Sequence, residues 1–301
     1  MIDRRLFIVS VPGMLTAGAA MANARPLPGR FDTAQIAAAV RVAEARSGGR
    51  VGLAVDAAGV PPRAGLAYSH RGNERFPMAS TFKMLLAAAI LERVDRGLDR
   101  LDRAVPVAAA DILPNSPVSQ RHVGGSATVA ELAEATMIYS DNTAANLLRP
   151  AIGGPAGLTA FLRRIGDPVT RLDRNEPAMS EARPGDPRDT TSPDAIVATW
   201  RTLLFGNVLG ETSKARLRQW LNANTTGDAR LRAGLPKSWQ VGDKTGTGNN
   251  NSVNDIAIAL PDQPGSSPIL IASFLNGGTA PTDVLNRLHA DLARSIAASL
   301  A

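Results

Sequence analysis

Strand-like patterns occur at both ends of this chain of 301 residues, and helical patterns fill the part between them. Helical periodicity dominates from residue 81 to residue 222 and returns in a closing helix predicted over 282–300. The runs that are typical of strands cover residues 50–57, 63–68, 239–244, 253–260 and 269–274. This order predicts an α/β protein with one sheet built from both ends of the chain, an all-helical insertion, and a site in the cleft between them.

The same patterns suggest domain boundaries. Residues 25–72 together with 223–301 are expected to form a discontinuous α/β domain, and residues 73–222 an all-helical domain. Asp32 or Thr33 is suited to cap a first helix, which Gly48-Gly49 would end.

Residues 1–24 have the composition of an export signal. Arg4 and Arg5 form a short basic region, an apolar run follows, and Ala-x-Ala sequences end at Ala22 and Ala24. The run is too short and too interrupted for a membrane helix, and the paired arginines favour the twin-arginine route over the general one. We expect cleavage near Ala22 to Ala24 and a periplasmic or secreted protein without a stable membrane anchor.

Composition excludes several kinds of chemistry. The chain has no cysteine, so disulfides, thiol catalysis and cysteine metal sites are excluded. Its three histidines lack the spacing of metal ligands, and we expect neither a metal nor a cofactor. The formal net charge of +6 is attributed to an evenly charged, Arg-rich surface, so no nucleic-acid partner is expected.

Ser80 and Lys83 are spaced so that one helix face carries both side chains. A serine hydroxyl becomes a good nucleophile only when a neighbouring group accepts its proton, and a lysine three residues later lies within reach. Pro77 and the change to a helical pattern place Ser80 at a helix N-terminus, where negative charge is stabilised. The alternative interpretation is that Ser80 only caps that helix.

Two further polar clusters have both a functional and a purely structural interpretation. The segment Ser140-Asp141-Asn142 follows an apolar helical run and could cap the helix expected from Thr143. The segment Lys244-Thr245-Gly246 comes at the end of a strand-like run. There the lysine could bind a carboxylate, or the glycines could form a hairpin.

Residues 171–191 are too polar and too rich in proline and glycine for a helix or strand. Long ordered loops inside compact domains are usually functional, although a surface crossover would have a similar composition. Glu176 lies in this loop.

In this order, the three motifs and the glutamate-bearing loop closely resemble class A serine β-lactamases. The similarity extends from about residue 31 to the C-terminal helix. It includes the stretches Phe76-Pro77-Met78-Ala79-Ser80-Thr81-Phe82-Lys83, Tyr139-Ser140-Asp141-Asn142-Thr143-Ala144-Ala145-Asn146, Leu172-Asp173-Arg174-Asn175-Glu176-Pro177, Asp189-Thr190-Thr191-Ser192-Pro193 and Val241-Gly242-Asp243-Lys244-Thr245-Gly246. The resemblance implies an antiparallel sheet flanked by the N- and C-terminal helices, and a monomer that uses no cofactor.

The resemblance also implies catalytic roles. Ser80 would attack the β-lactam carbonyl, and its own N–H and that of Thr247 would form the oxyanion hole. Lys83 and Glu176, the latter through a water, are both candidates for activating Ser80 in acylation. Ser140 would pass a proton to the leaving nitrogen, and Glu176 would activate the water that cleaves the acyl-enzyme.

The remaining carried-over roles concern binding and loop support. Asn142 would hold the acylamide side chain of the substrate. Arg230 would assist in binding its carboxylate, because residues 249–255 lack the arginine that many members have there. Arg174 and Asp189 fit the salt bridge that holds the loop around Glu176. The carboxylate itself would be bound by Lys244, Thr245, Gly246 and Thr247.

Five positions depart from common family patterns. Ser180 replaces an asparagine that binds the deacylating water, so slower or substrate-dependent deacylation is expected. Asn175 replaces a tryptophan, and Asn115 stands where an aromatic residue usually lines the cleft entrance. Ala79 and Gly248 replace the cysteine pair of some carbapenem-hydrolysing members.

These features predict hydrolysis of penicillins and some cephalosporins. Two alternatives are a penicillin-binding D-Ala-D-Ala carboxypeptidase and a β-lactam sensor that stays acylated. Glu176 argues against the first, which lacks a glutamate-bearing loop. A sensor normally needs a membrane anchor or signalling domain. Ser180, for which slower deacylation is expected, is the feature that leaves the sensor as an alternative.

Overall fold

The computed structural model describes residues 31–57 and 66–300, so the predicted export signal lies outside the described residues. A five-stranded antiparallel sheet with the order β2-β1-β9-β8-β7 is its central element. The strands are β1 (Arg50–Ala57), β2 (Leu66–His70), β7 (Gln240–Gly248), β8 (Ser252–Leu260) and β9 (Ile269–Asn276). Strands from both ends of the chain therefore share one sheet, which confirms the predicted fold class.

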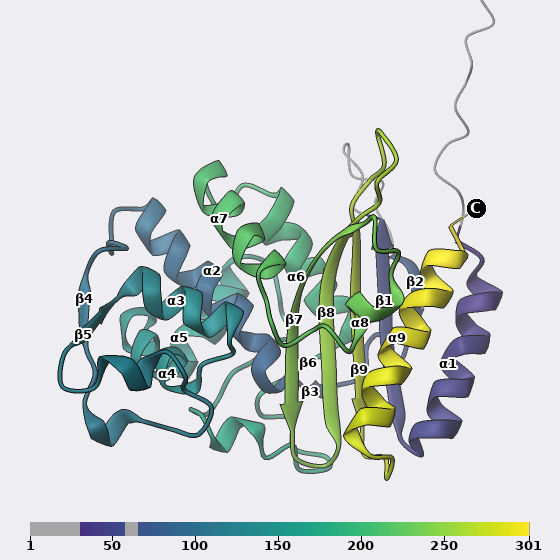
Figure 1. Cartoon of the computed structure of the whole chain (residues 1–301), viewed down its shortest axis with the longest axis horizontal. Coiled ribbons are helices and arrows are strands. Elements are labelled where there is room, and N and C mark those ends of the chain that lie inside the picture. The colour runs from purple at the N-terminus through teal and green to yellow at the C-terminus, as the bar shows by residue number, and fades with distance from the viewer. Residues whose placement is uncertain (1–30, 58–65, 301) are drawn as a thin grey trace, which may run out of the picture.

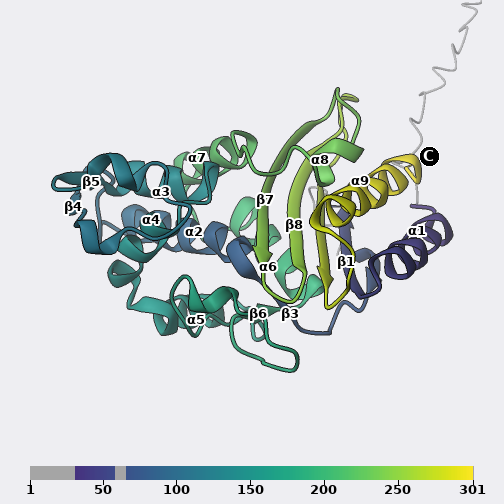
Figure 2. The ribbon, with the colours of Figure 1, turned by 60° about the horizontal axis from the view of Figure 1, so that its bottom comes forward.

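Helices cover both faces of the sheet (Figures 1 and 2). α1 (Thr33–Ser47) and α9 (Thr282–Ala298) pack side by side on one face. α6 (Pro193–Phe205) contacts β1 and β9. Each outer helix buries an apolar stripe, as Ile36 and Val40 do on α1. Two hydrophobic cores result, and the sheet separates them.

The other helices form a second body beside β7 (Figure 1). Its centre is α2, whose residues from Phe82 to Glu92 are all buried. A helix that is buried on all sides is hydrophobic all round, so this part of α2 has no polar face. The elements of this body are α2 (Phe82–Asp95), α3 (Val129–Ile138), α4 (Asn142–Leu148), α5 (Gly154–Arg164), α7 (Glu211–Asn222), β4 (Ala104–Pro106) and β5 (Ser126–Thr128).

Three short elements connect the two bodies. β3 (Phe76–Pro77) pairs with β6 (Thr190–Thr191), which joins the approach to α2 with the end of the loop 171–191. α8 (Leu231–Gly234) lies against α9. The division into domains at residues 72 and 223 stays a prediction.

Most predicted elements are confirmed, and the differences have local causes. Asp32 caps α1 through bonds from the N–H groups of Ala34 and Gln35, and the helix ends at Gly48 with φ +68°. The prediction that Lys244 ends a strand is wrong, because β7 continues to Gly248 in register with β8. The loop also contains a 3-10 turn at residues 178–180 and β6, where no regular structure was expected.

Two more predicted elements begin elsewhere than expected. α5 begins at Gly154, although its helical pattern was recognised only from residue 158. The second strand was predicted over residues 63–68 and is found at Leu66–His70, and residues 58–65 lie outside the description. Among the described residues, no helix is both long enough and apolar enough to cross a bilayer.

Leu203 tests the packing of α6. It is fully buried, and Leu203→Ala should lower the free energy of unfolding by about 2–5 kcal/mol, because the lost methyl groups leave a cavity. Urea denaturation with two spectroscopic probes measures the change. Leu98→Ala is the control: Leu98 is 52% exposed, and its loss should change stability by less than about 0.5 kcal/mol. Equal effects at the two positions would contradict this packing.

Candidate active site

Ser80 lies on a 3-10 turn, Ala79–Thr81, that leads directly into α2. The turn begins with Ala79 in a left-handed conformation, φ +44°. Strained backbone of this kind recurs at catalytic sites, where it fixes the direction of a side chain. Lys83 lies one turn further on, and its Nζ donates to Ser80 Oγ over 3.0 Å. The predicted pairing of these side chains is therefore present.

Lys83 Nζ is fully buried, and oxygen atoms surround it. It donates to Ser140 O at 2.7 Å, to Ser140 Oγ at 3.2 Å and to Asn142 Oδ1 at 2.6 Å. Ser140 has φ +57°, which turns both of its oxygens toward the amine. Asp141 accepts from the N–H of Ala144 and so caps α4. The motif therefore caps α4 and also contacts Lys83.

Glu176 approaches the same amine from the loop. Its Oε1 is 3.7 Å from Lys83 Nζ, and its Oε2 accepts from Ser180 Oγ at 3.2 Å. Asn146 bonds the backbone of Glu176 on both sides: its Nδ2 donates to the carbonyl at 3.0 Å, and its Oδ1 accepts from the N–H at 3.2 Å. The carboxylate is therefore held rigidly beside the lysine.

A salt bridge closes the loop around Glu176. Arg174 Nε lies 2.6 Å from Asp189 Oδ2, and Asp189 Oδ1 accepts from the N–H groups of Asp173 and Arg174. Asp189 is 1% exposed, so removing only its partner would leave a buried charge uncompensated.

β7 forms the opposite wall of the site. Gly246 lies so close to the turn of Ser80 that an added Cβ would be 2.6 Å from Met78 O. Arg230 reaches this strand, and its Nη atoms donate to Gly246 O at 3.0 Å and to Thr247 Oγ1 at 2.7 Å. The arginine assigned from sequence therefore contacts the Lys-Thr-Gly segment.

Burial lowers the pKa of both lysines in the site. The pKa of Lys83 falls to about 8 because the ammonium is removed from water, which the charge of Glu176 partly offsets. The pKa of Lys244 falls to about 7, through burial and the nearby charge of Lys83. A lysine of this kind has a substantial neutral fraction near neutral pH and can accept a proton.

The structure thus brings together all eleven residues that the sequence analysis assigned to the site. These are Ser80, Lys83, Ser140, Asn142, Glu176, Ser180, Arg230, Lys244, Thr245, Gly246 and Thr247. Sequence reasoning assigned no role to Asn146 or Thr226, whose Oγ1 is 2.5 Å from Thr245 Oγ1. The spacing of Asn146 four residues after Asn142 was the available signal.

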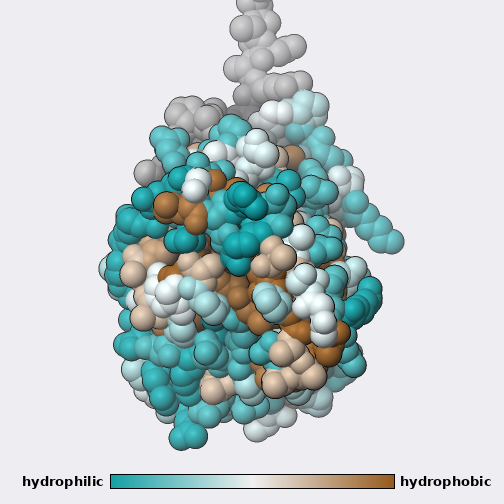
Figure 3. Space-filling model, turned by 90° about the vertical axis from the view of Figure 1, so that its left-hand side faces the viewer, coloured by the Kyte–Doolittle hydropathy of each residue, from teal (hydrophilic) through white to brown (hydrophobic). Residues whose placement is uncertain are grey.

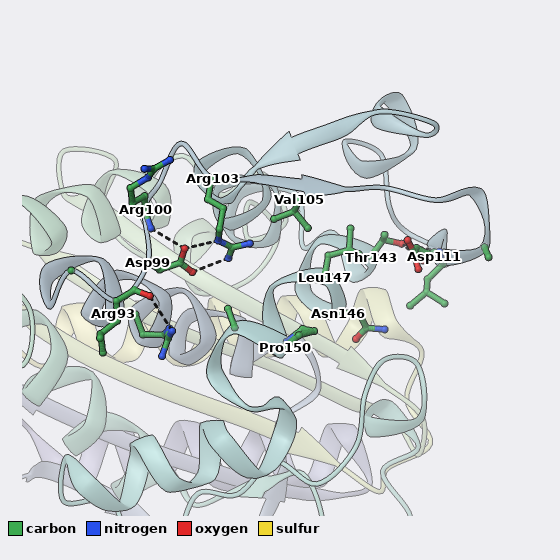
Figure 4. A pocket seen from close by; sticks show the side chains of 15 residues that line it. Arg93, Asp99, Arg100, Arg103, Val105, Asp111, Thr143, Asn146, Leu147 and Pro150 are labelled. Atoms are coloured by element: carbon green, nitrogen blue, oxygen red, sulfur yellow. Dashed lines mark hydrogen bonds and ion pairs between the residues drawn. The ribbon is translucent and has the colours of Figure 1, made fainter.

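A pocket in the helical body lies outside this site. It has a volume of about 940 Å³ and lies in the helical body, between the end of α2 and α4. Figure 4 shows Asp99 bonded to Arg103 on one side of this pocket and Asn146 on the other. The helical end of the molecule also shows apolar surface surrounded by hydrophilic residues (Figure 3). The pocket lining includes neither Ser80 nor Glu176, so it is separate from the catalytic groups.

Residues 31–57 and 66–300 contain no cluster of three or more His, Asp or Glu side chains suited to a metal ion.

Stability should depend on pH through Lys83. Its folded pKa of about 8 is below the ordinary value of 10.5, so between these values the unfolded chain binds more protons and the free energy of unfolding rises with pH. The stability of the wild type relative to Lys83→Met should therefore increase as pH rises from about 8 to about 10.5, and urea denaturation measures it. With Lys237→Met, which changes an exposed lysine, the difference should stay constant. A constant or decreasing difference for Lys83→Met would contradict the lowered pKa.

Comparisons with known proteins agree with this geometry. The model of the β-lactamase enzyme family matches residues 33–300. β-Lactamase L2 of Stenotrophomonas maltophilia is 50% identical over 209 residues, which is 69% of each chain. CTX-M-8 of Citrobacter amalonaticus is 46% identical over 77% of each chain.

Solved structures show the same relationship. An ancestral class A β-lactamase has a TM-score of 0.83 and 53% identity, covering 87% of this chain and 98% of its own. A β-lactamase from Xanthomonas campestris pv. campestris has a TM-score of 0.86 and 46% identity, covering 91% and 100%. The chain therefore belongs to the β-lactamase family, and it is a class A serine β-lactamase.

Proposed function

We propose that this β-lactamase hydrolyses penicillins and some cephalosporins through an acyl-enzyme on Ser80. The observation that carries the proposal is the connected network in which Lys83 Nζ reaches Ser80 Oγ, Ser140 Oγ and Glu176 Oε1. Ser80 Oγ attacks the lactam carbonyl and its proton passes into this network. Ser140 Oγ then gives a proton to the ring nitrogen as the carbon–nitrogen bond breaks.

Deacylation is assigned to Glu176. Its carboxylate accepts a proton from a water, which attacks the acyl carbonyl and releases Ser80. Two arrangements remain open for acylation. Lys83 bonds Ser80 directly at 3.0 Å, and its lowered pKa suits a proton acceptor. Glu176, 3.7 Å beyond Lys83, would act through a water.

Substrate recognition is assigned to β7 and α4. The charges of Lys244 and Arg230 attract the substrate carboxylate, while Thr245 and Thr247 offer hydroxyls beside it. The N–H groups of Ser80 and Thr247 stabilise the oxyanion, and losing such a donor typically costs about 10²- to 10³-fold in rate. Gly246 lets the substrate approach the strand, and Asn142 bonds the acylamide group.

Three departures limit the range of substrates. Ser180 Oγ already donates to Glu176 Oε2 over 3.2 Å, and a hydroxyl offers less than an amide to a deacylating water. The amide of Asn115 donates to Ser140 O at 2.9 Å, so this side chain supports the site and provides no aromatic wall. Ala79 and Gly248 exclude the cysteine pair of some carbapenemases. A carbapenem turned over as fast as a penicillin would contradict this restriction.

The sequence and the site also favour a cellular location and an oligomeric state for the protein. The composition of residues 1–24 supports export to the periplasm or medium, where the enzyme would confer β-lactam resistance. A monomer suffices, because one chain supplies every catalytic group named above. Neither nucleic acid nor a membrane anchor has a role.

The position of Glu176 favours turnover over the two alternatives. A carboxypeptidase of the penicillin-binding class lacks this loop, and a sensor that stays acylated needs no group to activate water. Here Glu176 is held by Asn146 within 3.7 Å of Lys83.

Intact mass after mixing with benzylpenicillin tests the proposal. The lactam absorbance should fall over many equivalents while the protein mass returns to its starting value. Glu176→Gln should instead gain the mass of one penicillin and keep it, because no group then activates water. Ser80→Ala, which lacks the nucleophile, should gain no mass. A wild type that stays acylated after one equivalent would support the sensor and contradict turnover.

Arg230→Gln tests carboxylate binding. Losing a charge-assisted contact should raise KM for benzylpenicillin about 10-fold, with a smaller effect on kcat. Steady-state kinetics measure both constants, and a thermal melt checks that the variant folds. Arg294→Gln removes an exposed arginine of α9 and should leave KM unchanged. If KM for Arg230→Gln equals that of the wild type, another group binds the carboxylate.

A further inference from the structure

Arg149 is a buried cation that the mechanism above does not use. It is 1% exposed and begins the 3-10 turn Arg149–Ile152, which continues α4. Its Nη1 donates to Asn175 Oδ1 at 2.8 Å and to Arg174 O at 3.3 Å. Its guanidinium lies 4.6 Å from the centre of the Phe82 ring. Within the described part of the chain, Nε and Nη2 have no hydrogen-bond partner, and no carboxylate lies within salt-bridge distance of Arg149.

A buried charge without a carboxylate partner destabilises a protein, and an apolar residue of similar volume is often better tolerated. Burial lowers the pKa of Arg149 to about 10, and the charges of Glu176 and Asp189 oppose this effect. The group is therefore a cation at neutral pH. A role in the adjacent site would explain why a charge occupies this position.

Arg149 shares one helix face with two residues of the site. Asn142, Asn146 and Arg149 follow at spacings of four and three residues, which places them in one row. Asn142 accepts from Lys83, and Asn146 bonds the backbone of Glu176. Arg149 bonds the two residues that immediately precede Glu176. The row therefore supports the lysine and the glutamate from one side.

Asn175 is the residue of the loop whose side chain contacts Arg149. Asn175 Oδ1 here accepts the shorter of the two bonds from Arg149. The asparagine and the buried arginine thus form a pair in this chain.

Arg149 is a cation near Glu176 that forms no ion pair with a carboxylate of the described residues. Arg174 is neutralised by Asp189 and Glu181, with which it forms ion pairs at 2.6 and 2.8 Å. The cations whose charges act on Glu176 are Lys83 on α2 and Arg149 after α4, while Asp141 lies near Lys83 and Asp189 near Arg149.

We propose that Arg149 is a positioning residue for deacylation, which holds the segment before Glu176 through its bond to Asn175. This inference rests on the proposed role of Glu176. It assigns no contact between Arg149 and the substrate.

Arg149→Met and Arg149→Lys separate charge from packing. Arg149→Met removes the charge and keeps most of the volume, so deacylation of benzylpenicillin should slow by about 10- to 100-fold, a larger change than in acylation. Arg149→Lys keeps a cationic donor at this position and should recover part of the deacylation rate that Arg149→Met loses, with acylation unchanged.

The measurement is single-turnover mass spectrometry, which gives acylation and deacylation separately. Lys214→Met is the matched control, since it removes a buried cation of α7 far from Glu176 in the chain and should leave both rates unchanged. Asn175→Leu keeps the cation and removes its acceptor, so it should also slow deacylation more than acylation.

Several results would overturn the proposal. One is a wild-type deacylation profile for Arg149→Met. Another is an equal loss in both steps, which indicates a structural role only. If Arg149→Met does not fold, wild-type deacylation in Asn175→Leu decides against the proposal. The proposed function fails separately, when the wild type itself does not release its acyl group.

Discussion

The buried ammonium of Lys83 is the interaction on which the rest of the site depends. A charge without access to water is stable only where oxygen atoms replace its hydration, and Ser80, Ser140, Asn142 and Glu176 supply them from three separate segments. Each of these groups is therefore fixed in position by the same amine. The strained φ angles of Ala79 and Ser140 are part of this arrangement.

Charge is concentrated beneath β7 as well. Asp243 and Asp255 are fully buried, and burial and their mutual repulsion raise the pKa of Asp255 well above its ordinary range. Arg230 and Arg232 approach these carboxylates from the segment before and within α8. A strand that buries the amine of Lys244 thus has compensating charges near it, which a hydrophobic core would not provide.

The helix α4 connects the groups to which the two proposed steps are assigned. Its first residue contacts Lys83, its middle holds Glu176, and its extension reaches the loop before Glu176. A rigid helix places these contacts more accurately than a loop can, because its residues have fixed spacing and few alternative conformations. Small changes along this face are therefore expected to alter the balance of the two steps.

The sequence by itself determined the order of elements and the sheet built from both ends, and it predicted four catalytic side chains, because local periodicity and short motifs carry that information. It suggested Arg230 because the segment around this residue resembles the alternative arginine position of other family members. It stopped β7 at Lys244, since Gly246 and Gly248 are poor strand formers and only pairing with β8 keeps them extended. Only the tertiary structure decided that Asn146, Arg149 and Asn175 meet at Glu176. Their contacts join residues 25 to 30 positions apart, and their spacing in the chain reveals only a shared helix face.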